Sequence, residues 1–310
     1  DLLGRLEVDA NQDLLDRNIN NKTVLITGAG GSIGSEISRQ VYANHPKSII
    51  LLDSNEYALY SIKNELDNSK LDTAVYSVLA NITNKERVKE ILRVFKVDTI
   101  YHTAAYKHVS LVEENPFEAV KNNIFGTQII AELSIEINVE TLVLISTDKA
   151  VRPTNIMGAT KRFAELLLQA LSERNETNMT MVRFGNVIGS SGSAVPLFQR
   201  QIKEGGPVTL THPDVTRYFM TATEAAQLVI QASAMGKSAE VFVLDMGKSV
   251  KIKDLIYKMI SLAGFTVKDD KNPIGDIEIK ILGLRPGEKL YEELLIGENP
   301  EKTYHKKIKK

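Results

Sequence analysis

Two short strings in the middle of the chain bring together residue types that exchange protons. Ser146-Thr147-Asp148-Lys149 places a carboxyl group next to an amine, and general acid–base chemistry uses such groups. An isolated Asp148–Lys149 pair is carboxylate and ammonium at pH 7, whereas a closed, dry site disfavours both charges and can move the proton to Asp148. Ser, Thr and Asp are also good helix N-caps, so the string has a purely structural interpretation as well. Lys149 is less easily explained by capping.

The second string is Met157-Gly-Ala-Thr-Lys161, whose first and last residues are four apart. On a helix this spacing puts both side chains on one face. A thioether does not act as an acid or a base, so Lys161 is the titratable member of the pair. The alternative interpretation makes Met157 a plain core residue.

A glycine-rich loop near the start of the chain predicts a dinucleotide site. Residues 27–34 (TGAGGSIG) follow an apolar, β-branched run, and helical spacing begins at Ser35. Glycines in this pattern let the chain turn tightly and let a pyrophosphate approach the backbone, while the helix N-terminus offers unpaired N–H groups. The residues that we assign to this loop are Gly28, Gly31, Ser32, Ile33 and Gly34.

Asp53 ends the next predicted strand, 53 − 34 = 19 residues beyond the last glycine. An acid about 20 residues beyond such a loop binds the ribose hydroxyls. A carboxylate repels a 2′-phosphate, and Ser54 and Asn55 bring no arginine to balance one, so NAD is favoured over NADP. The alternative is a turn Asp before a helix cap. Asn81, after the third strand, is placed either to meet the adenine edge or to serve as a turn residue.

The hydrophobic pattern predicts a scaffold that brings these strand ends together. Short β-branched runs alternate with stretches of helical spacing, which predicts an α/β fold with a doubly wound parallel sheet. The predicted strands are Thr23–Thr27, Ser48–Leu52, Thr73–Val78, Thr99–Tyr101 and Thr141–Ile145. The predicted helices are Ser35–Tyr42, Tyr57–Leu66, Lys85–Phe95, Phe117–Ile137, Thr223–Ala234 and Ile252–Leu262.

Beyond about Asn186 the pattern loosens, and glycines and prolines mark loops. We therefore expect a lead-in segment at 1–20, a dinucleotide-binding domain at 21–185 and a smaller, mainly substrate-binding lobe at 186–310 that is partly interleaved with it. The basic tail His305–Lys310 is expected to be solvated and frayed.

Composition and charge exclude several classes of protein. Hydrophobic residues make up 43% of the 310 residues and charged residues 25%, as in globular proteins. Lys+Arg minus Asp+Glu is 38 − 39 = −1, so the chain lacks the basic balance of a nucleic-acid-binding protein. It has no cysteine, and its five histidines show no metal-ligand spacing, so we predict no metal. No apolar run approaches the ~18 residues of a membrane span, and no signal peptide is visible. Because the first residue is Asp1, we expect part of a longer protein.

Several strings are similar to those of the extended short-chain dehydrogenase/reductase family, which has a Rossmann-like fold. They are the TGxxGxxG spacing, Ala104-Ala105, Asn123–Thr127 (NIFGT) and Ser146–Lys149. From about residue 23 to 295 the chain resembles more specifically the nucleotide-sugar 4,6-dehydratases of polysaccharide biosynthesis. The strings that carry this resemblance are YKHV (106–109), STDKAVRPTNIMGATK (146–161), RFGNVIGSSGS (183–193), HPDVTRYF (212–219) and LRPGEKL (284–290).

The resemblance implies an NAD-dependent UDP-N-acetylglucosamine 4,6-dehydratase. In that reaction hydride leaves C4 of the sugar and returns at C6, a base removes the C5 proton, and an acid protonates the departing C6 hydroxyl. The resemblance makes Lys149 the base and Asp148 the acid, and Thr147 hydrogen-bonds the C4 oxygen. The family at large has tyrosine where Met157 stands. The long 4,6-dehydratases are similar in carrying methionine there, and Lys161 is then expected to hold the nicotinamide ribose.

The resemblance also implies further contacts. Those to the cofactor are Asn81, Ile82, Ala104, Ala105, Lys107 and Asn123. Those to the substrate are Lys107, Asn186, Arg217, Arg285 and Glu288, with Arg285 preferred for a phosphate because its planar fork matches phosphate oxygens. The group that takes the C4 hydroxyl proton is left open between Thr147, Asp148 and a water.

The chain also resembles the catalytic half of long, membrane-tethered members, in which a segment like Asp1–Arg5 follows a transmembrane region. This implies a cytoplasmic catalytic domain of a protein anchored in a bacterial inner membrane. The resemblance further implies at least a homodimer, through helices that start near Asn115 and Asn155.

Three other functions remain open: a C5-inverting dehydratase, a UDP-sugar 4-epimerase and a non-catalytic NAD-binding regulator. The Asp148–Lys149 pair favours dehydration over epimerisation, because epimerisation at C4 needs no acid at C6. Lys161 and Arg285 count against the regulator. Met157 favours retention at C5, since the chain resembles the methionine-bearing long members.

Overall fold

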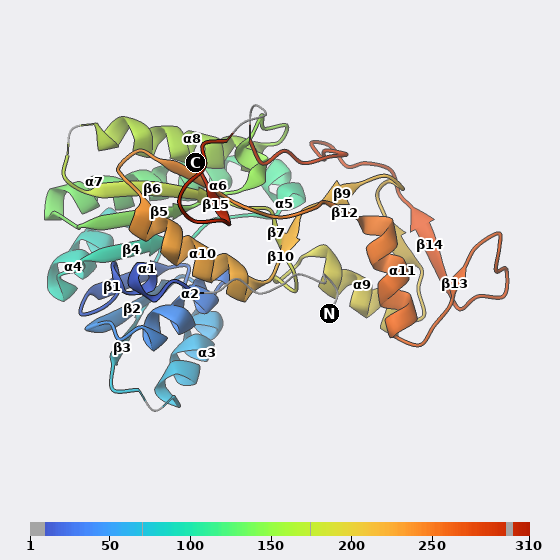
Figure 1. Ribbon diagram of the computed structural model, residues 1–310, viewed down its shortest axis with the longest axis horizontal. Coiled ribbons are helices and arrows are strands. Elements are labelled where there is room, and N and C mark those ends of the chain that lie inside the picture. The colour runs from blue at the N-terminus through green and yellow to red at the C-terminus, as the bar shows by residue number, and fades with distance from the viewer. Residues whose placement is uncertain (1–9, 70, 174, 296–299) are drawn as a thin grey trace.

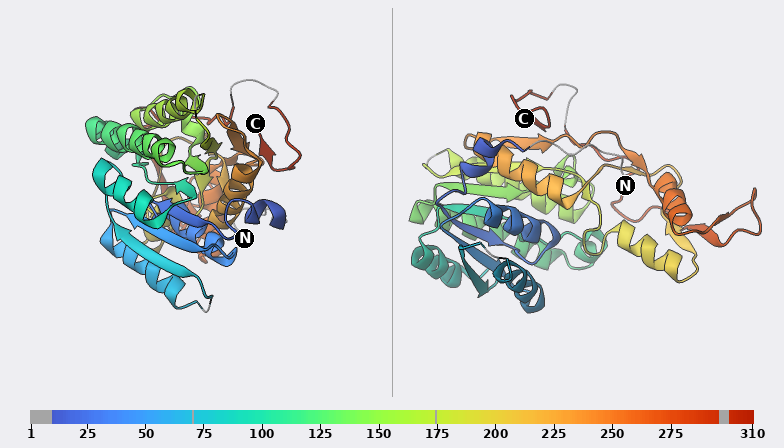
Figure 2. Two further views of the ribbon diagram at one scale, coloured as in Figure 1. Left: turned by 90° about the vertical axis from the view of Figure 1, so that its left-hand side faces the viewer. Right: turned by 60° about the horizontal axis from the view of Figure 1, so that its bottom comes forward.

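The computed structural model describes residues 10–69, 71–173, 175–295 and 300–310. A sheet between two layers of helices forms the larger body, and a smaller lobe projects from one end of it (Figure 1, Figure 2). In spatial order the sheet contains β15 (Ile308–Lys309), β11 (Val241–Leu244), β6 (Asn178–Arg183), β5 (Thr141–Ile145), β4 (Thr99–His102), β1 (Thr23–Thr27), β2 (Ser48–Asp53) and β3 (Ala74–Leu79). Every pair is parallel except β11–β15. The predicted doubly wound parallel α/β fold is confirmed.

Apolar side chains cover both faces of this sheet. One face packs against α1 (Gln12–Asp16), α2 (Ser32–Ala43), α3 (Glu56–Asp67) and α10 (Ala222–Met235). The other packs against α4 (Lys85–Phe95), α7 (Gly126–Ile137) and α8 (Ile156–Ser172). The central strands β1 and β5 are buried at every residue, as their apolar runs predict. The edge strand β3 differs, since most of its residues are exposed.

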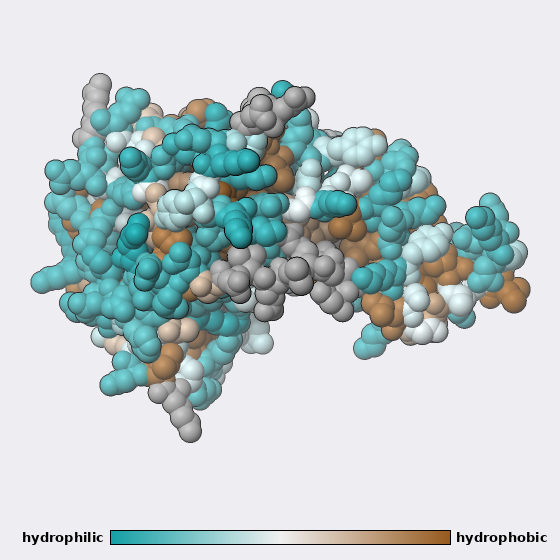
Figure 3. Space-filling model, viewed as in Figure 1, coloured by the Kyte–Doolittle hydropathy of each residue, from teal (hydrophilic) through white to brown (hydrophobic). Residues whose placement is uncertain are grey.

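The smaller lobe has its own apolar core, which includes Phe198, Val208 and Ile256. Its elements are β7 (Asn186–Val187), α9 (Ala194–Lys203), β8 (Val208–Leu210), β9 (Thr216–Arg217), β10 (Phe219–Met220), β12 (Val250–Lys251), α11 (Ile252–Leu262), β13 (Val267–Lys268) and β14 (Ile277–Ile281). The chain leaves the lobe to form α10 and β11 in the main body and returns to it afterwards. The lobe is therefore assembled from separate stretches of sequence. Figure 3 shows apolar surface over the end that carries α11, β13 and β14, where Leu262 and Ile274 are exposed.

Two local expectations are wrong. The basic tail is not frayed, because Ile308 is fully buried and β15 pairs antiparallel with β11. This pairing satisfies backbone groups that the edge of β11 otherwise exposes. The first helix after the glycine loop begins at Ser32 and not at Ser35, because Gly31 already serves as its N-cap. The predicted segment Asp1–Arg5 lies outside the described residues. Among the described helices, none has the length and apolar character needed to span a bilayer.

Candidate active site

A cavity of about 1050 Å³ lies at the carboxyl ends of the parallel strands. Open α/β sheets bind their ligands at this edge. Most of the predicted site residues line it: Gly28, Gly31, Ser32, Ile33, Gly34, Asp53, Asn81, Ile82, Ala104, Ala105, Lys107, Thr147, Lys149, Met157, Lys161 and Asn186. Asp148 and Asn123 are buried behind its wall, while Arg217, Arg285 and Glu288 are absent from its lining.

The glycine loop is packed as tightly as backbone atoms allow. Gly28 has φ +68°, and a Cβ there would lie 2.8 Å from the Ala104 Cα. A Cβ on Gly34 would lie 2.0 Å from the Gly28 carbonyl oxygen. Gly31, the N-cap of α2, has no side chain to cap the helix, so the first N–H groups of α2 lack a side-chain acceptor at a point where Gly31 and Ser32 line the cavity. The loop therefore fits the pyrophosphate of a dinucleotide.

Asp53 is fixed against this loop. Its Oδ2 accepts a hydrogen bond from the Gly30 N–H at 2.9 Å, and its Oδ1 accepts one from the Asn55 N–H at 2.9 Å. Both carboxylate oxygens thus accept hydrogen bonds from backbone N–H groups, and the side chain also lines the cavity. Asn81 fulfils the turn alternative, since its Oδ1 accepts from the N–H and the hydroxyl of Thr83 at 2.9 and 2.8 Å.

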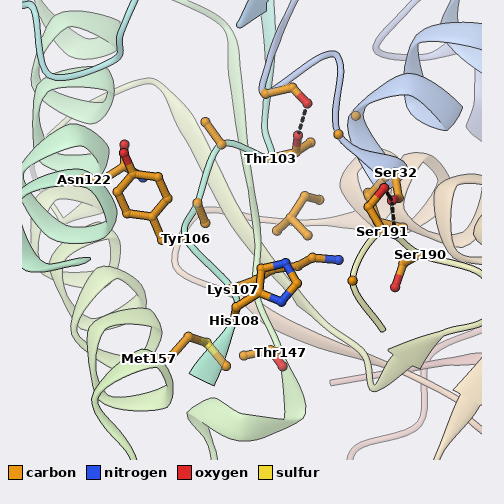
Figure 4. A pocket seen from close by; sticks show the side chains of 18 of the residues that line it. Ser32, Thr103, Tyr106, Lys107, His108, Asn122, Thr147, Met157, Ser190 and Ser191 are labelled. Atoms are coloured by element: carbon orange, nitrogen blue, oxygen red, sulfur yellow. Dashed lines mark hydrogen bonds between the residues drawn. The ribbon is translucent and has the colours of Figure 1, made fainter. Parts of the chain in front are cut away.

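A loop from the lobe side closes over the glycine loop, a feature that the sequence did not indicate. The Ser191 N–H donates to the Ser32 Oγ at 3.1 Å, and the Ser32 hydroxyl lies 3.4 Å from the Ser191 Oγ (Figure 4). Ser190 and Gly192 also line the cavity. This contact joins the two parts of the chain across the predicted phosphate site.

The string Ser146–Lys149 follows β5 and has two separate roles. Thr147 is the N-cap of the short 3₁₀ helix η2 (Asp148–Ala150), and its Oγ1 accepts from the Lys149 N–H at 3.3 Å. The capping interpretation is therefore correct for Thr147. Asp148 does not cap, because its fully buried carboxylate accepts at Oδ1 from the Thr147 hydroxyl at 2.9 Å and from Lys149 Nζ at 3.0 Å.

The second oxygen of Asp148 has an unusual environment. Asp148 Oδ2 is buried and makes no hydrogen bond within the described part of the chain. It lies 3.1 Å from the position that a Cβ on Gly185 would take, and Gly185 lines the cavity. An unpaired buried carboxylate oxygen is costly, which suits a group that has a partner only when substrate is bound.

Lys149 is surrounded by oxygens from three directions. Its Nζ lies 3.0 Å from Asp148 Oδ1, 3.6 Å from Glu292 Oε1 and 3.5 Å from Asn186 Oδ1. Burial lowers the pKa of Lys149, but the charges of Asp148 and Glu292 outweigh burial and raise it above its usual value. The structure therefore favours the ammonium form of Lys149.

Met157 and Lys161 lie on the same side of α8 and both line the cavity, as their spacing predicts. Met157 also packs against Val112 and Ala119, so part of the core interpretation holds too. Burial lowers the pKa of Lys161 to about 8, against the opposing charge of Glu165. Figure 4 shows Met157, Thr147, Lys107 and His108 along one stretch of the cavity wall.

A buried ion pair supports this wall from behind, and no sequence pattern indicated it. Glu165 on α8 accepts from Arg183 Nε at 2.7 Å, from Arg183 Nη2 at 2.5 Å and from the Ser146 hydroxyl at 2.6 Å. Arg162 adds a bond at 2.9 Å. Burial raises the pKa of Glu165, but Arg183 and the other donors outweigh it and hold the pKa below its usual range. The brace joins α8, β6 and the residue before Thr147.

Asn123 reaches the site through a distortion of its helix. The predicted helix 117–137 is divided into α6 (Pro116–Ala119), a π-helical segment η1 (Val120–Phe125) and α7. The side chain of Asn123 accepts from the Tyr106 N–H at 2.8 Å and donates to the Tyr106 carbonyl at 3.0 Å. It thus fixes the backbone next to Lys107, whose pKa burial lowers.

The predicted substrate residues of the lobe are only partly brought to the cavity. Arg217 forms an ion pair with Glu288 at 3.0 Å, and Arg217 Nε lies 3.9 Å from Glu292 Oε1. Both residues are thus connected to Lys149 through Glu292. Arg285 is exposed on its loop, away from the lining. The buried Glu292 was missed, because the sequence presents it only as one of two adjacent acids.

Residues 24–310 match the family described as "Polysaccharide biosynthesis protein". The chain belongs to this family. It is 52% identical over 310 residues to a protein of Staphylococcus aureus named "Capsular polysaccharide biosynthesis protein CapD", covering 99% of this chain and 51% of that protein. The chain thus spans about half the length of this relative. A solved structure, Pen from Bacillus thuringiensis, is 38% identical with a TM-score of 0.81, covering 90% of this chain and 85% of that one.

Two more distant relatives are named as enzymes that act on UDP-sugars. One is "UDP-N-acetylglucosamine 4,6-dehydratase (inverting)" of Campylobacter jejuni, 30% identical over 92% of this chain and 80% of the relative. Another is "UDP-glucose 4-epimerase" of Rickettsia canadensis, 33% identical over 91% of this chain and 80% of the relative. The expected membership in the extended short-chain dehydrogenase/reductase family is confirmed. In the described residues, no group of His, Asp and Glu is arranged to hold a metal ion.

Proposed function

We propose that the chain is an NAD-dependent UDP-N-acetylglucosamine 4,6-dehydratase that retains the configuration at C5. The product is UDP-2-acetamido-2,6-dideoxy-α-D-xylo-hexos-4-ulose, a precursor for bacterial surface glycans or protein glycosylation. The observation that carries the proposal is the Asp148–Lys149 pair, with Nζ and Oδ1 3.0 Å apart, beside a cavity that also contains a glycine phosphate loop. Dehydration needs an acid and a base next to a bound dinucleotide, and the chain places such a pair beside a loop suited to the dinucleotide's phosphates.

The glycine loop and Asp53 are the residues that hold NAD. Asp53 favours NAD over NADP because a carboxylate repels a 2′-phosphate. Lys161 donates to the nicotinamide ribose from the cavity wall. NAD, when bound, takes up hydride from C4 of the sugar and returns it to C6.

The chain's own residues handle the protons. Lys149 removes the C5 proton once its own proton has passed to Asp148. Asp148 then protonates the departing C6 hydroxyl, and its unpaired Oδ2 is the oxygen free for this contact. Thr147 lines the cavity and hydrogen-bonds the C4 oxygen after releasing Asp148. The C4 hydroxyl gives up its own proton when hydride leaves C4, and this proton replaces the one that Asp148 gives to the departing hydroxyl. Lys149 returns a proton to C5 once C6 has been reduced. Arg217, Arg285, Glu288, Asn186 and Lys107 bind the nucleotide and sugar.

Two alternative enzymes share this fold family. A 4-epimerase needs no acid at C6, whereas Asp148 is buried and its Oδ2 has no hydrogen-bond partner among the described residues. A C5-inverting dehydratase needs a proton donor on the opposite face of the sugar. Met157 stands at the position where the family at large has tyrosine, and a thioether cannot donate.

An isotope experiment tests the proposal. The protein is incubated with UDP-N-acetylglucosamine in D₂O, and the product is analysed by NMR. We expect the 4-keto-6-deoxy sugar with unchanged configuration at C5, deuterium at C5 and the original C4 hydrogen on C6, with no net accumulation of NADH. A C4 epimer, an inverted C5 or stoichiometric NADH contradicts the proposal.

We also infer that the protein is a homodimer at least, assembled through α6, η1 and α8. The support is a set of exposed aromatic residues on these elements: Phe117 is 86% exposed, Phe125 52% and Phe163 53%. Exposed apolar patches of this kind mark interfaces. Light scattering should give a dimeric mass for the parent and a lower mass for Phe163→Glu, whereas a monomeric parent at tens of micromolar refutes the inference.

We infer further that the full-length protein is anchored in the bacterial inner membrane with this domain in the cytoplasm. The support is the resemblance to long, membrane-tethered members, and the chain spans 51% of CapD. Fractionation of cells expressing the full-length gene should recover this domain with the inner membrane, and recovery in the soluble fraction contradicts the inference.

A further inference from the structure

Glu292 is a buried acid that none of the roles above explains. Its side chain is 4% exposed, and its Oε1 lies 3.6 Å from Lys149 Nζ and 3.9 Å from Arg217 Nε. Its other oxygen, Oε2, is buried and forms no hydrogen bond with the described residues. A carboxylate is costly to bury, so its position beside the acid–base pair calls for a reason.

The chain holds Glu292 there by docking its segment onto the start of α8. Thr154 Oγ1 and Asn155 Nδ2 both donate to the Gly287 carbonyl, at 2.9 and 3.1 Å. Lys289 Nζ donates to the Val151 carbonyl at 2.9 Å. These contacts anchor the segment to the residues that directly follow the 3₁₀ helix carrying Lys149, so Glu292 is positioned by several bonds that do not involve its own side chain.

The charges that face Lys149 come from three elements. Asp148 belongs to the same 3₁₀ helix, Glu292 to the C-terminal segment and Arg217 to β9, while Asn186 from β7 is neutral. Glu288 pairs with Arg217 on the far side, at 3.0 Å, so Arg217 has a closer carboxylate than Glu292. Removing the Glu292 charge therefore takes away one of the two carboxylates beside Lys149 and leaves Asp148 as the other.

We propose that Glu292 is a positioning residue that raises the pH range over which the Lys149–Asp148 pair holds one shared proton. This rests on the proposed function, in which that pair supplies both the base and the acid. The active form of the pair holds one proton. Losing it at high pH leaves no acid, and gaining a second at low pH leaves no base, so the pair titrates in two macroscopic steps.

The sign of the effect follows from the charge. A carboxylate near the pair favours the protonated state in both steps, so replacing Glu292 by glutamine lowers both apparent pKa values. Even at the dielectric constant of water, a unit charge 3.6 Å away moves a pKa by about one unit. We therefore expect both limbs of the pH–rate profile to move toward lower pH by about one unit or more.

The test compares the pH dependence of kcat for dehydration in the parent, Glu292→Gln and Glu293→Gln. Glu293 is a matched control: it is the adjacent residue and loses the same charge, but its side chain is 42% exposed and pairs with Arg152 and Lys289. Glu292→Gln should shift both limbs, and Glu293→Gln should leave both in place. Limbs that stay in place in Glu292→Gln, or that shift equally in both variants, overturn the proposal.

A second measurement separates this proposal from the proposed function. The protein is labelled with lysine carrying ¹³C at Cε, the Lys149 signal is assigned with Lys149→Met, and its pKa is measured by NMR without turnover. A lower pKa in Glu292→Gln supports the proposal even if the parent dehydrates no sugar, and an equal pKa refutes it. If Glu292→Gln fails to fold, Glu292→Asp keeps the charge but withdraws it by one methylene, and its limbs should move in the same direction by less.

Discussion

The buried Glu165–Arg183 pair gives a sharp test of how the site is braced. Arg183→Met keeps the length of the side chain and removes both bonds to Glu165, at 2.7 and 2.5 Å. Glu165 is fully buried, so its charge cannot turn to water. It keeps only the Ser146 hydroxyl at 2.6 Å and Arg162 at 2.9 Å.

The size of the loss follows from these remaining partners. Breaking a buried ion pair by removing one member costs about 3–5 kcal/mol. Arg162 still forms an ion pair with Glu165 and partly replaces Arg183 as its partner. The Arg162 side chain is 35% exposed, so solvent weakens this interaction. We therefore expect Arg183→Met to lose about 3 kcal/mol, at the low end of that range. Arg162→Met should lose less than about 1 kcal/mol, because a half-exposed charge is screened by solvent.

Urea unfolding at pH 7, followed by circular dichroism, measures both variants. The double variant Glu165→Leu with Arg183→Met removes the charges together and should lie within about 2 kcal/mol of the parent, since an apolar pair can replace a buried ion pair. The reasoning is refuted if Arg183→Met loses less than about 1 kcal/mol, or if the double variant loses the sum of the two single losses.

The same pair predicts a pH dependence. Because the pKa of Glu165 is lowered in the folded protein, its contribution to stability is present above the unfolded pKa of about 4.3 and is lost as pH falls through the folded value. The difference between parent and Arg183→Met should therefore shrink as pH falls below about 4.3, toward pH 3. A difference that stays constant over this range contradicts the electrostatic origin of the loss.

Three further predictions concern the cavity. Asp148→Asn should reduce dehydration by about 10²–10⁴-fold while NADH and UDP-sugar still bind in equilibrium dialysis, because only the acid is lost; a rate within a few-fold of the parent removes Asp148 from the mechanism. Cofactor extracted from the purified protein should be NAD, and finding mainly NADP in the parent contradicts this. In fluorescence titrations, Asp53→Asn should bind NADH and NADPH with more similar affinities than the parent does. NADH affinity should fall as pH rises from 7 to 9, because the pKa of Lys161 is about 8 and its ammonium is then lost; an affinity independent of pH in this range refutes the role of Lys161.

The main sheet could be predicted from sequence because its signals are local. Strands β1 and β5 and helices α4 and α11 have the predicted bounds, since continuous apolar runs mark the two strands and apolar residues at helical spacing mark the two helices. The tail was mispredicted for the opposite reason. Its four lysines indicate a solvated end, but its fate depends on the free edge of β11, which lies more than sixty residues earlier in the chain.

The site divides in the same way. Gly28, Asp53, Lys149 and Lys161 stand next to strand ends or on one helix face, so spacing alone brings them to the cavity. Glu292 depends on a segment that folds back across the lobe onto α8, and no local pattern indicates which of two adjacent acids is buried. Arg285 is the opposite case. Its side chain type is well suited to a phosphate, but it lies exposed on its loop and does not line the cavity.

The protonation state of the central pair connects these observations to the reaction. The structure favours ammonium on Lys149, which cannot act as a base, so the proposed mechanism requires the proton to move to Asp148 when substrate binds. This transfer turns two opposite charges into two neutral groups without changing the net charge of the cluster. Lys149 keeps 17% of its side chain exposed at the cavity, and a sugar that covers it removes the water that stabilises the ammonium. In the proposed mechanism, covering the cavity therefore drives the pair toward its active form, and without Glu292 the same step would start from a pair that holds its proton less tightly.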